Sequence, residues 1–544
     1  MDFNSIFDRN ARLYAGKAVL YFSDSGITLS HVQIRDLSQR LALWMLTVGV
    51  KRGDRVGIWM GNVCEFALAV AACMRIGAAA VPFSIFESVE SIEAMCRESN
   101  CRLLMYDGKN KHIERRIRQS FSPRHVQAID ISRYGTPDTI RLDFIPADLP
   151  DHRIHCRRNS GEEAFLLFTS GSTGEKKPVS IPLASIAEFQ LSRTLFDLVA
   201  CLYPLRFFSM FPWYHISGIH RLFSILCGHN EFCCTADHFS PVSATKALAA
   251  HRITVWQGTA TMLSRCCVFR HSAEFRLPPI VITAGEAVSR HVLDVLEKHP
   301  GASIMVATYG STEISGISNL LYHFSNVTPF FRFASGIIKP LLQIRHTYSF
   351  RDFDTDNRVF PLGDSHSGLQ TAIWDEETNN LLPDGCPGEI IVHSRQLASR
   401  YARSKSDNLL IKLGGKLYVR TGDLGFQRGR RLYMIGRKKN LIIRSGENIV
   451  PAGIEQAAMH QPCVQSAIAF GIPSKTHGED ICLCLEGDPA AIDLAAMKQH
   501  LENTLPRYMI PQHIDVFREF PVGETGKTSV RTLREIMCEK YPIQ

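Results

Sequence analysis

Short apolar runs alternate with segments of helical periodicity over residues 17–125. After a weakly patterned stretch at Ser132–Ser160, further apolar runs, each followed by a loop of small residues, continue to Glu313. Apolar positions at helical spacing predict a helix capped by Thr28 that runs through Leu43, and a mostly apolar helix from Glu65 to Ile76. Strands separated by helices are typical of parallel sheets whose faces are covered by helices. The runs predict strands that begin at Ala18, Arg55, Ala79, Phe208, Thr254, Ile280 and Ile304.

The alternation stops at residues 317–362, which contain the aromatic cluster Phe330–Phe333 and a charged turn. This break predicts an insertion of unknown function. Strands resume at Leu369–Trp374 and Gly388–Val392, and Pro451 is expected to open a helix that runs through Ala458.

Small-residue loops follow several of these strands. In open α/β sheets, ligands bind beyond the carboxyl ends of the strands, so we expect the loops to converge on one site. The most informative loop follows the apolar run Leu166–Phe168. Its glycines let the backbone approach a ligand, and its hydroxyls and lysine suit a polyphosphate. The alternative is a mobile Ser/Gly surface loop. The candidate residues are Thr169, Ser170, Gly171, Ser172, Thr173, Gly174 and Lys177.

Three further features each allow two interpretations. His215 lies at the end of an apolar strand, where a lone histidine is most often structural. Asp423 lies in Tyr418–Gly425, predicted as a tight turn, where a carboxylate either accepts hydrogen bonds from a ribose diol or caps its own turn. The basic stretch from Arg428 to Arg444 is either a solvated face or a path for a polyanion.

Composition narrows the class of protein. The chain has 544 residues, 45% of them hydrophobic and 21% charged, as in soluble globular proteins of more than one domain. No apolar run approaches the roughly 18 residues of a membrane span, and no signal peptide is visible. Sixteen scattered cysteines indicate free thiols in a reducing compartment, so we expect a cytoplasmic protein. A net charge of +8 permits anionic ligands but does not demand nucleic acid.

Taken together, the loops resemble those of the adenylate-forming superfamily, and among its members most closely those of acyl-CoA synthetases. The resemblance spans about residues 15–535 and rests on Thr169–Gly174, Gly285–Ala287, Tyr309–Glu313, Thr421–Asp423, Gly436–Ile449 and Gly526–Lys527, in that order. It implies two half-reactions. A carboxylate attacks the α-phosphate of Mg-ATP to give an acyl-adenylate and pyrophosphate, and a thiol of coenzyme A or of a carrier phosphopantetheine then displaces AMP.

The resemblance also implies a fold. We expect an N-terminal core domain over 1–436, with parallel or mixed sheets flanked by helices and a distorted barrel. A small, mobile α+β domain over 437–544 is expected to carry the catalytic Lys527 and to work in two orientations about Lys439.

Site roles follow from the same resemblance. Thr169–Lys177 would hold the β- and γ-phosphates, Thr312 the α-phosphate and Glu313 the Mg²⁺ ion, while Lys527 would bridge the carboxylate and the α-phosphate. Adenine would lie between Tyr309 and Gly285–Glu286–Ala287, and the ribose would bind Asp423 and Arg437. The remaining candidates are catalytic His215, the cofactor-binding residues Thr308, Gly310, Ser311, Lys439, Gly446 and Glu447, and the acyl-pocket residues Trp213, Trp256, Thr283, Ala284 and Ala307.

The substrate class can be narrowed further. Amino-acid-activating relatives place an aspartate near the turn Pro212–Gly218 to pair with the α-ammonium, but this chain has no Asp or Glu from Arg206 to Asn230. Because a buried ammonium without a partner is costly, we expect an aryl or aliphatic acid without an α-amino group. The chain departs from the superfamily pattern at one position. A glycine usually follows the loop lysine there, whereas this chain has Pro178, which removes one N–H donor at the edge of the loop.

Two alternatives remain open. One is a stand-alone adenylation enzyme that loads a carrier protein, and the other is a catalytically inactive nucleotide-binding scaffold. Glu313, Asp423 and Lys527 are all present, which favours an enzyme. We expect no nucleic-acid partner and a monomer or homodimer.

Overall fold

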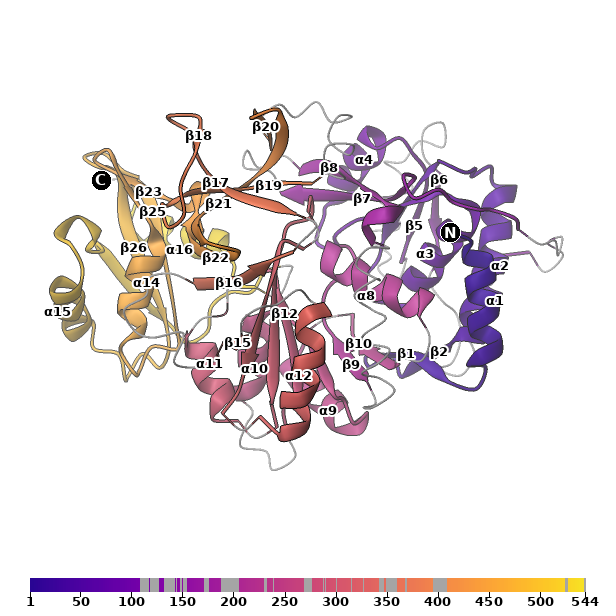
Figure 1. The fold of residues 1–544 in the computed structure, drawn as a ribbon, viewed down its shortest axis with the longest axis horizontal. Coiled ribbons are helices and arrows are strands. Elements are labelled where there is room, and N and C mark those ends of the chain that lie inside the picture. The colour runs from indigo at the N-terminus through magenta and orange to yellow at the C-terminus, as the bar shows by residue number, and fades with distance from the viewer. Residues whose placement is uncertain are drawn as a thin grey trace. The chain divides into compact units, whose positions relative to one another are not determined.

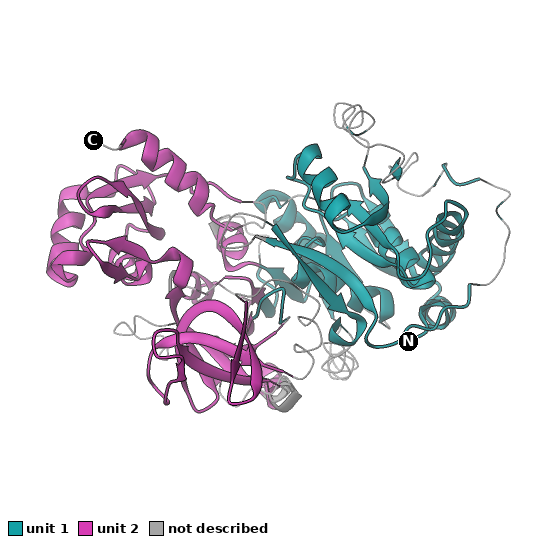
Figure 2. Cartoon of the chain, turned by 90° about the horizontal axis from the view of Figure 1, so that it is seen from above, with its two compact units in different colours: residues 1–258, 268–282, 310–315 teal, residues 259–267, 283–309, 316–544 magenta. Residues whose placement is uncertain are grey.

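A computed structural model describes the chain apart from residues 108–116, 118–126, 132–141, 143, 147–148, 150–153, 171–175, 187–204, 229–231, 238, 269–275, 287, 289, 300, 315, 326, 342–346, 349–359, 367–368, 395–408, 524–526 and 543–544. Figure 1 labels its helices and strands. The chain divides into two compact units, coloured separately in Figure 2. Unit 1 comprises residues 1–258, 268–282 and 310–315, and unit 2 comprises residues 259–267, 283–309 and 316–544.

Unit 1 contains a six-stranded sheet in the order β6-β5-β3-β4-β7-β8. Its first five strands are parallel and β8 is antiparallel to β7, as the alternation of strands and helices predicted for most of the sheet. Helix α3 is buried along its whole length and ends at Gly77, whose φ of 80° is the left-handed conformation that glycine adopts without strain. The elements are β3 (Arg55–Trp59), α3 (Cys64–Ile76), β4 (Ala79–Pro82), α4 (Val89–Glu98), β5 (Cys101–Tyr106), β6 (Gln127–Asp130), β7 (Glu163–Ser170) and β8 (Lys176–Pro182).

A second set of strands in unit 1 has the order β2-β1-β10-β9-β11 and is parallel except for β2. Here the predicted helix start at Thr28 is wrong. Thr28 lies in β2, and Ser30 caps α2 through a capping box with Gln33, because the Ser-x-x-Gln pair satisfies two backbone N–H groups together. The elements are α1 (Phe3–Leu13), β1 (Ala18–Phe22), β2 (Ile27–Ser30), α2 (His31–Thr47), β9 (Arg206–Ser209), α8 (Ile216–Cys227), β10 (Phe232–Thr235), α9 (Pro241–Ala250) and β11 (Val255–Gly258).

Unit 2 contains a largely antiparallel run of strands in the order β18-β17-β19-β21-β22-β16-β14-β13. The segment predicted as an insertion is regular at both ends, because β14 pairs with β13 and β16. The elements are β13 (Ile304–Tyr309), β14 (Ser318–His323), α12 (Pro329–Leu341), β15 (Thr347–Tyr348), β16 (Phe360–Ser365), β17 (Gln370–Asp375), β18 (Asn380–Leu381), β19 (Gly388–His393), β20 (Leu410–Leu413), β21 (Lys416–Arg428) and β22 (Arg431–Arg437). Three further elements are α10 (Ala260–Val268), β12 (Ile280–Ala284) and α11 (Arg290–Glu297); residues 280–282 of β12 and Val268 of α10 belong to unit 1.

The C-terminal part of unit 2 forms its own five-stranded sheet, β24-β23-β26-β25 with β27 beside β26. Its two hydrophobic clusters draw only on residues 442–541, and the domain boundary at residue 437 stays a prediction. The elements are η3 (Lys438–Asn440), β23 (Ile442–Arg444), β24 (Glu447–Ile449), α14 (Pro451–Met459), β25 (Ser466–Ser474), β26 (Gly478–Glu486), α15 (Leu494–Thr504), η4 (Arg507–Met509), β27 (His513–Phe517) and α16 (Val530–Lys540).

The hydrophobic core of this C-terminal part predicts how its stability responds when a buried side chain is shortened. Leu483 in β26 is fully buried, so Leu483→Ala is expected to destabilise the part by about 2–5 kcal/mol through lost burial and the cavity it leaves. Hydrogen exchange of the β25 and β26 amides measures this locally. Leu494→Ala is the matched control, because Leu494 is 42% exposed and its loss is expected to cost less than about 0.5 kcal/mol. Equal protection in both variants would contradict the assigned core.

Candidate active site

The stem of the predicted phosphate loop is a β-hairpin in unit 1. Thr169 pairs with Lys177, and Ser170 with Lys176, across β7 and β8. Gly171, Ser172, Thr173 and Gly174 lie outside the described residues. Lys176 forms an ion pair with Glu87 in the turn before α4, so the second lysine, Lys177, is the better candidate for a phosphate contact. Pro178 lies opposite Phe168 within the hairpin.

The aromatic residues of unit 1 occupy different environments. Trp213 is almost fully buried against the rings of Phe22 and Phe66, so the structure places it in the core of the unit. His215 caps α8 with its backbone and packs against Tyr214. Trp256 packs against Phe208 with the two rings tilted by 34°, and its buried indole N–H has no hydrogen-bond acceptor among the described residues. That donor keeps Trp256 a candidate for contact with a ligand.

Thr312 and Glu313 lie in a turn of unit 1 that follows β13. Glu313 is half-buried and makes no hydrogen bond or ion pair with another described residue. A carboxylate with unused oxygens fits a Mg²⁺ ion, which is commonly held by one or two carboxylates together with substrate phosphates. Gly310 and Ser311 precede this turn and are half-buried.

Asp423 is the best-defined polar group of unit 2. It is 4% exposed and lies in the long strand β21, so the predicted tight turn at Tyr418–Gly425 is wrong. Tyr309 donates its hydroxyl to Asp423 Oδ2 at 2.6 Å, and Arg437 Nε lies 2.8 Å from Oδ1. The Arg437 contact is an ion pair without hydrogen-bond alignment, which leaves Oδ1 without a donor in the described part of the chain. Because the carboxylate does not cap its own backbone, the ribose interpretation is favoured over the capping one.

Burial and the neighbouring carboxylate raise the pKa of Tyr309 well above its usual value, so the hydroxyl stays protonated and remains a donor.

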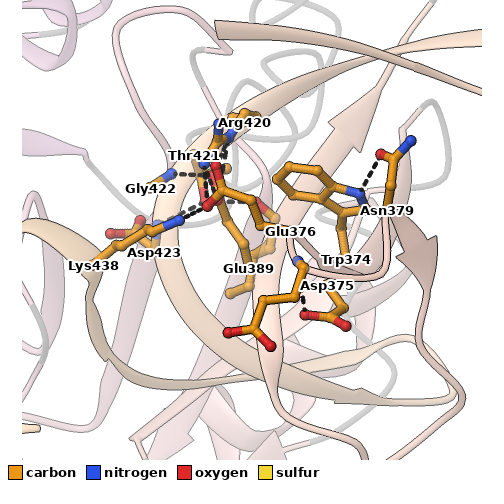
Figure 3. A network of polar contacts seen from close by, with 12 residues as sticks. Trp374, Asp375, Glu376, Asn379, Glu389, Arg420, Thr421, Gly422, Asp423 and Lys438 are labelled. Carbon is orange, nitrogen blue, oxygen red and sulfur yellow. Dashed lines mark hydrogen bonds and ion pairs between the residues drawn. The ribbon is translucent and has the colours of Figure 1, made fainter. Parts of the chain in front are cut away.

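The strand that carries Asp423 is fixed by a second buried carboxylate. Glu389 accepts hydrogen bonds from Nε and Nη2 of Arg420, the shortest at 2.7 Å, and from the backbone N–H of Gly422 at 3.2 Å. Figure 3 shows this network, in which Glu376 contacts both Arg420 and Lys438. Sequence reasoning missed Glu389 and Arg420, since they come from different strands and no local spacing links them.

Lys527 lies against Gly285: a Cβ atom at Gly285 would be 3.1 Å from the lysine Nζ. Burial is the main cause that lowers the pKa of Lys527, and it also lowers the pKa of Lys439. Glu286 accepts hydrogen bonds from the backbone N–H and the hydroxyl of Thr261. The structure therefore brings Lys527, Gly285 and Glu286 together within unit 2. Ala287 lies outside the described residues.

The other candidates in unit 2 are placed as follows. Thr283 Oγ1 is buried without a partner among the described residues, and Ala284 and Ala307 are half-buried on β12 and β13. Thr308 donates to Asn319 at 3.0 Å. Ser445 and Gly446 form the two-residue turn between β23 and β24, both with positive φ, and Glu447 opens β24.

A model of the family described as AMP-binding enzyme matches residues 7–402. The chain belongs to the AMP-binding enzyme family. The recognised family is thereby confirmed. The relatives and solved structures described next confirm the class of AMP-forming acid–thiol ligase and the mixed α/β fold.

Similar AMP-binding enzymes cover nearly the whole chain. The acyl-CoA ligase sidI of Aspergillus fumigatus is 25% identical over 96% of this chain and 89% of its own length. The oxalate–CoA ligase of Arabidopsis thaliana is 23% identical over 98% and 96%. Among solved structures, ATP-bound MatB from Rhodopseudomonas palustris has a TM-score of 0.75 at 20% identity, covering 99% of this chain and 100% of that one. The anthranilate CoA ligase AuaEII with anthranoyl-AMP has a TM-score of 0.74 at 16% identity, covering 98% and 97%. These structures support the fold.

No helix in the described ranges is long and apolar enough to span a membrane.

The hydrogen bond between Tyr309 and Asp423 makes a direct prediction. Tyr309→Phe removes the donor and leaves a buried carboxylate oxygen unpaired, so ATP binding is expected to weaken about 5- to 30-fold. Calorimetric titration with ATP measures the change. Tyr433→Phe is the control, since Tyr433 stacks on Phe426 in the same unit. If both variants bind ATP like the unaltered enzyme, Asp423 does not depend on Tyr309.

Proposed function

We propose that this ligase activates an aryl or aliphatic carboxylic acid without an α-amino group and transfers the acyl group to coenzyme A. The chain is an AMP-binding enzyme, and the observation that supports nucleotide activation at this site is the buried carboxylate of Asp423. Tyr309 and Arg437 contact this carboxylate, and its Oδ1 accepts no hydrogen bond from the described residues. Such a group is suited to accept hydrogen bonds from a ribose hydroxyl, which positions the nucleotide for attack at its α-phosphate.

In the first half-reaction, an oxygen of the substrate carboxylate forms a bond to the α-phosphorus, and the bond to the leaving pyrophosphate oxygen breaks. Lys527 is proposed to supply a half-buried ammonium beside Gly285, where a cation stabilises charge more than in water because the surroundings are less polar. Lys177 and Thr312 are proposed to bind phosphate oxygens. A Mg²⁺ ion held by Glu313 would neutralise charge on the triphosphate.

In the second half-reaction, a thiol attacks the acyl carbonyl carbon and AMP leaves. The turn Ser445–Gly446 and Glu447 are proposed to approach the site in this step, after rotation of the C-terminal part about Lys439. Lys527 and this turn lie in the same C-terminal part of the chain, so we propose that this part takes a different orientation in each step. Coenzyme A is favoured over a carrier protein because the relatives with matching length are acyl-CoA ligases.

The substrate class rests on charge. Helix α8 and the strand before it carry no acidic residue from Arg206 to Asn230, and most of α8 is buried, so an α-ammonium would find no counter-ion there. The relatives are named for a small dicarboxylate and for medium-chain acids, so their names leave the length of the substrate acid open.

The described cysteines are free thiols, which supports the cytoplasm as the proposed location.

Pyrophosphate exchange into ATP tests the proposal. A panel of aryl, aliphatic and α-amino acids is measured first without a thiol, and thioester formation is then followed with coenzyme A or with a phosphopantetheinyl carrier. We expect exchange with at least one acid that has no α-amino group, and thioester formation with coenzyme A. Efficient exchange with ordinary α-amino acids would contradict the substrate class, and product only with the carrier would contradict the acceptor.

A further inference from the structure

Lys527 lies in one of two short antiparallel segments, residues 521–523 and 527–529. The Gly523 N–H donates to the Lys527 carbonyl at 2.7 Å, and the Ser529 N–H donates to the Pro521 carbonyl at 2.8 Å, with an antiparallel bridge between these two bonds. The bonds tie the backbone of Lys527 to the chain that directly follows Phe520. A contact that fixes Phe520 therefore also fixes the base from which the Lys527 side chain extends.

Phe520 is anchored in the C-terminal part of the chain. Its side chain is 2% exposed and belongs to the same hydrophobic cluster as Leu533 and Met537 of α16. Its N–H donates to Oε1 of Glu486, the last residue of β26, at 2.7 Å. Phe520 thus moves with the C-terminal sheet, and a residue outside this part that binds Phe520 holds the whole part in one orientation.

Arg265 of α10 makes such a contact. Its Nη2 donates to the carbonyl oxygen of Phe520 at 2.8 Å, although the two residues are 255 positions apart in the sequence. Hydrogen bonds with an ionised donor are roughly twice as strong as those between neutral groups. Because the acceptor is a backbone carbonyl of the C-terminal part, the bond breaks when that part rotates away from α10.

The same face of α10 has a second connection to the site. Thr261 lies four residues before Arg265, so their side chains are neighbours about one helical turn apart. The Glu286 carboxylate accepts hydrogen bonds from the backbone N–H of Thr261 and, at 3.0 Å, from its hydroxyl. Glu286 adjoins Gly285, where a Cβ atom would be 3.1 Å from the Lys527 Nζ. Helix α10 therefore connects to the base of the Lys527 segment and to the loop against which the ammonium lies.

We propose that Arg265 is a positioning residue for adenylation, because its hydrogen bond to Phe520 favours the orientation of the C-terminal part in which Lys527 lies against Gly285. Arg265 acts through Lys527 and not on substrate, and the inference rests on the proposed role of Lys527. Loss of the bond lowers the population of this orientation, and with it the rate of the first half-reaction. The second half-reaction is proposed to use the other orientation, so it does not need the bond.

The test uses Arg265→Met, because methionine keeps a long side chain and a high helix propensity but has no N–H donor. Pyrophosphate exchange with the best acid of the panel measures the first half-reaction, and thioester formation from supplied acyl-adenylate measures the second. We expect exchange to slow about tenfold. Thioester formation is expected to stay unchanged or to rise by up to about threefold as the other orientation becomes more populated. Arg265→Lys retains a donor and is expected to lose less exchange than Arg265→Met.

Arg206→Met is the matched control. Arg206 Nε also donates to a backbone carbonyl, that of His251 at 2.6 Å, but this contact lies within unit 1. Its loss is expected to change neither half-reaction by more than about twofold. An equal change of the ratio between the two half-reactions in Arg206→Met and Arg265→Met would show that the effect is not specific to Phe520, and would contradict the proposal.

A double-mutant cycle tests whether Arg265 acts through the lysine. Once Lys527 is replaced by alanine, there is no ammonium left to position, so Arg265→Met is expected to slow the remaining exchange by less than about twofold. A full tenfold loss in the Lys527→Ala background would show that Arg265 acts independently of Lys527, and the positioning role would be wrong.

Lys527→Ala by itself separates this inference from the function beneath it. If Lys527→Ala loses exchange by ~100-fold or more while Arg265→Met exchanges like the unaltered enzyme, Lys527 is catalytic and Arg265 does not position it. If Arg265→Met slows both half-reactions equally, its effect is structural and the inference fails. If Lys527→Ala retains exchange, the proposed role of Lys527 is itself wrong, and the role of Arg265 is wrong with it.

Discussion

The burial of one carboxylate constrains the site in unit 2. Asp423 is almost inaccessible to solvent, and an ionised carboxyl removed from water is tolerated only when donors and cations replace its hydration. Tyr309 supplies one hydrogen bond to Oδ2 and Arg437 an ion pair to Oδ1, and Oδ1 accepts no hydrogen bond from the described residues. We propose that a substrate hydroxyl completes the last hydrogen bond of this carboxylate.

A supporting layer holds that carboxylate in position. Glu389 is 3% exposed and engages Arg420 through two guanidinium nitrogens, an arrangement with defined direction as well as strength. Removing one partner of such a buried pair typically costs about 3–5 kcal/mol, since it leaves an uncompensated charge. Through the backbone N–H of Gly422, the pair fixes the residue before Asp423, and Gly422 itself adopts a φ of 70°. The geometry at Asp423 therefore depends on contacts made one strand away.

The predictable part of this molecule was local. The starts of the strands at Ala18 and Ala79 were predicted to the residue, because apolar runs bounded by turn residues indicate a buried sheet directly. The helix from Pro451 was found because proline is favoured at a first helical position. Motif order identified the family, and it led to Tyr309, Asp423, Arg437 and Lys527, which the structure brings into unit 2.

Pairings across the sheet could not be predicted in the same way. The cap of α2 was misplaced because Thr28 and Ser30 are both good caps and only the β1–β2 pairing decides between them. Asp423 was expected in a turn because Thr-Gly-Asp is typical of turns, but tertiary pairing with β19 and β22 keeps it in a strand. Glu389 and Glu286 have no sequence signal for their partners, since burial and charge complementarity emerge only when distant elements pack.

The transfer of oxygen from the acid to AMP tests the adenylate mechanism most directly. The substrate acid is labelled with ¹⁸O in its carboxyl group, turned over with ATP and coenzyme A, and the nucleotide product is analysed by mass spectrometry. If the carboxylate attacks the α-phosphorus at the nucleotide held by Asp423, one ¹⁸O atom appears in AMP and unlabelled pyrophosphate is released. Label in inorganic phosphate together with ADP would show attack at the γ-phosphorus instead, and would contradict the account.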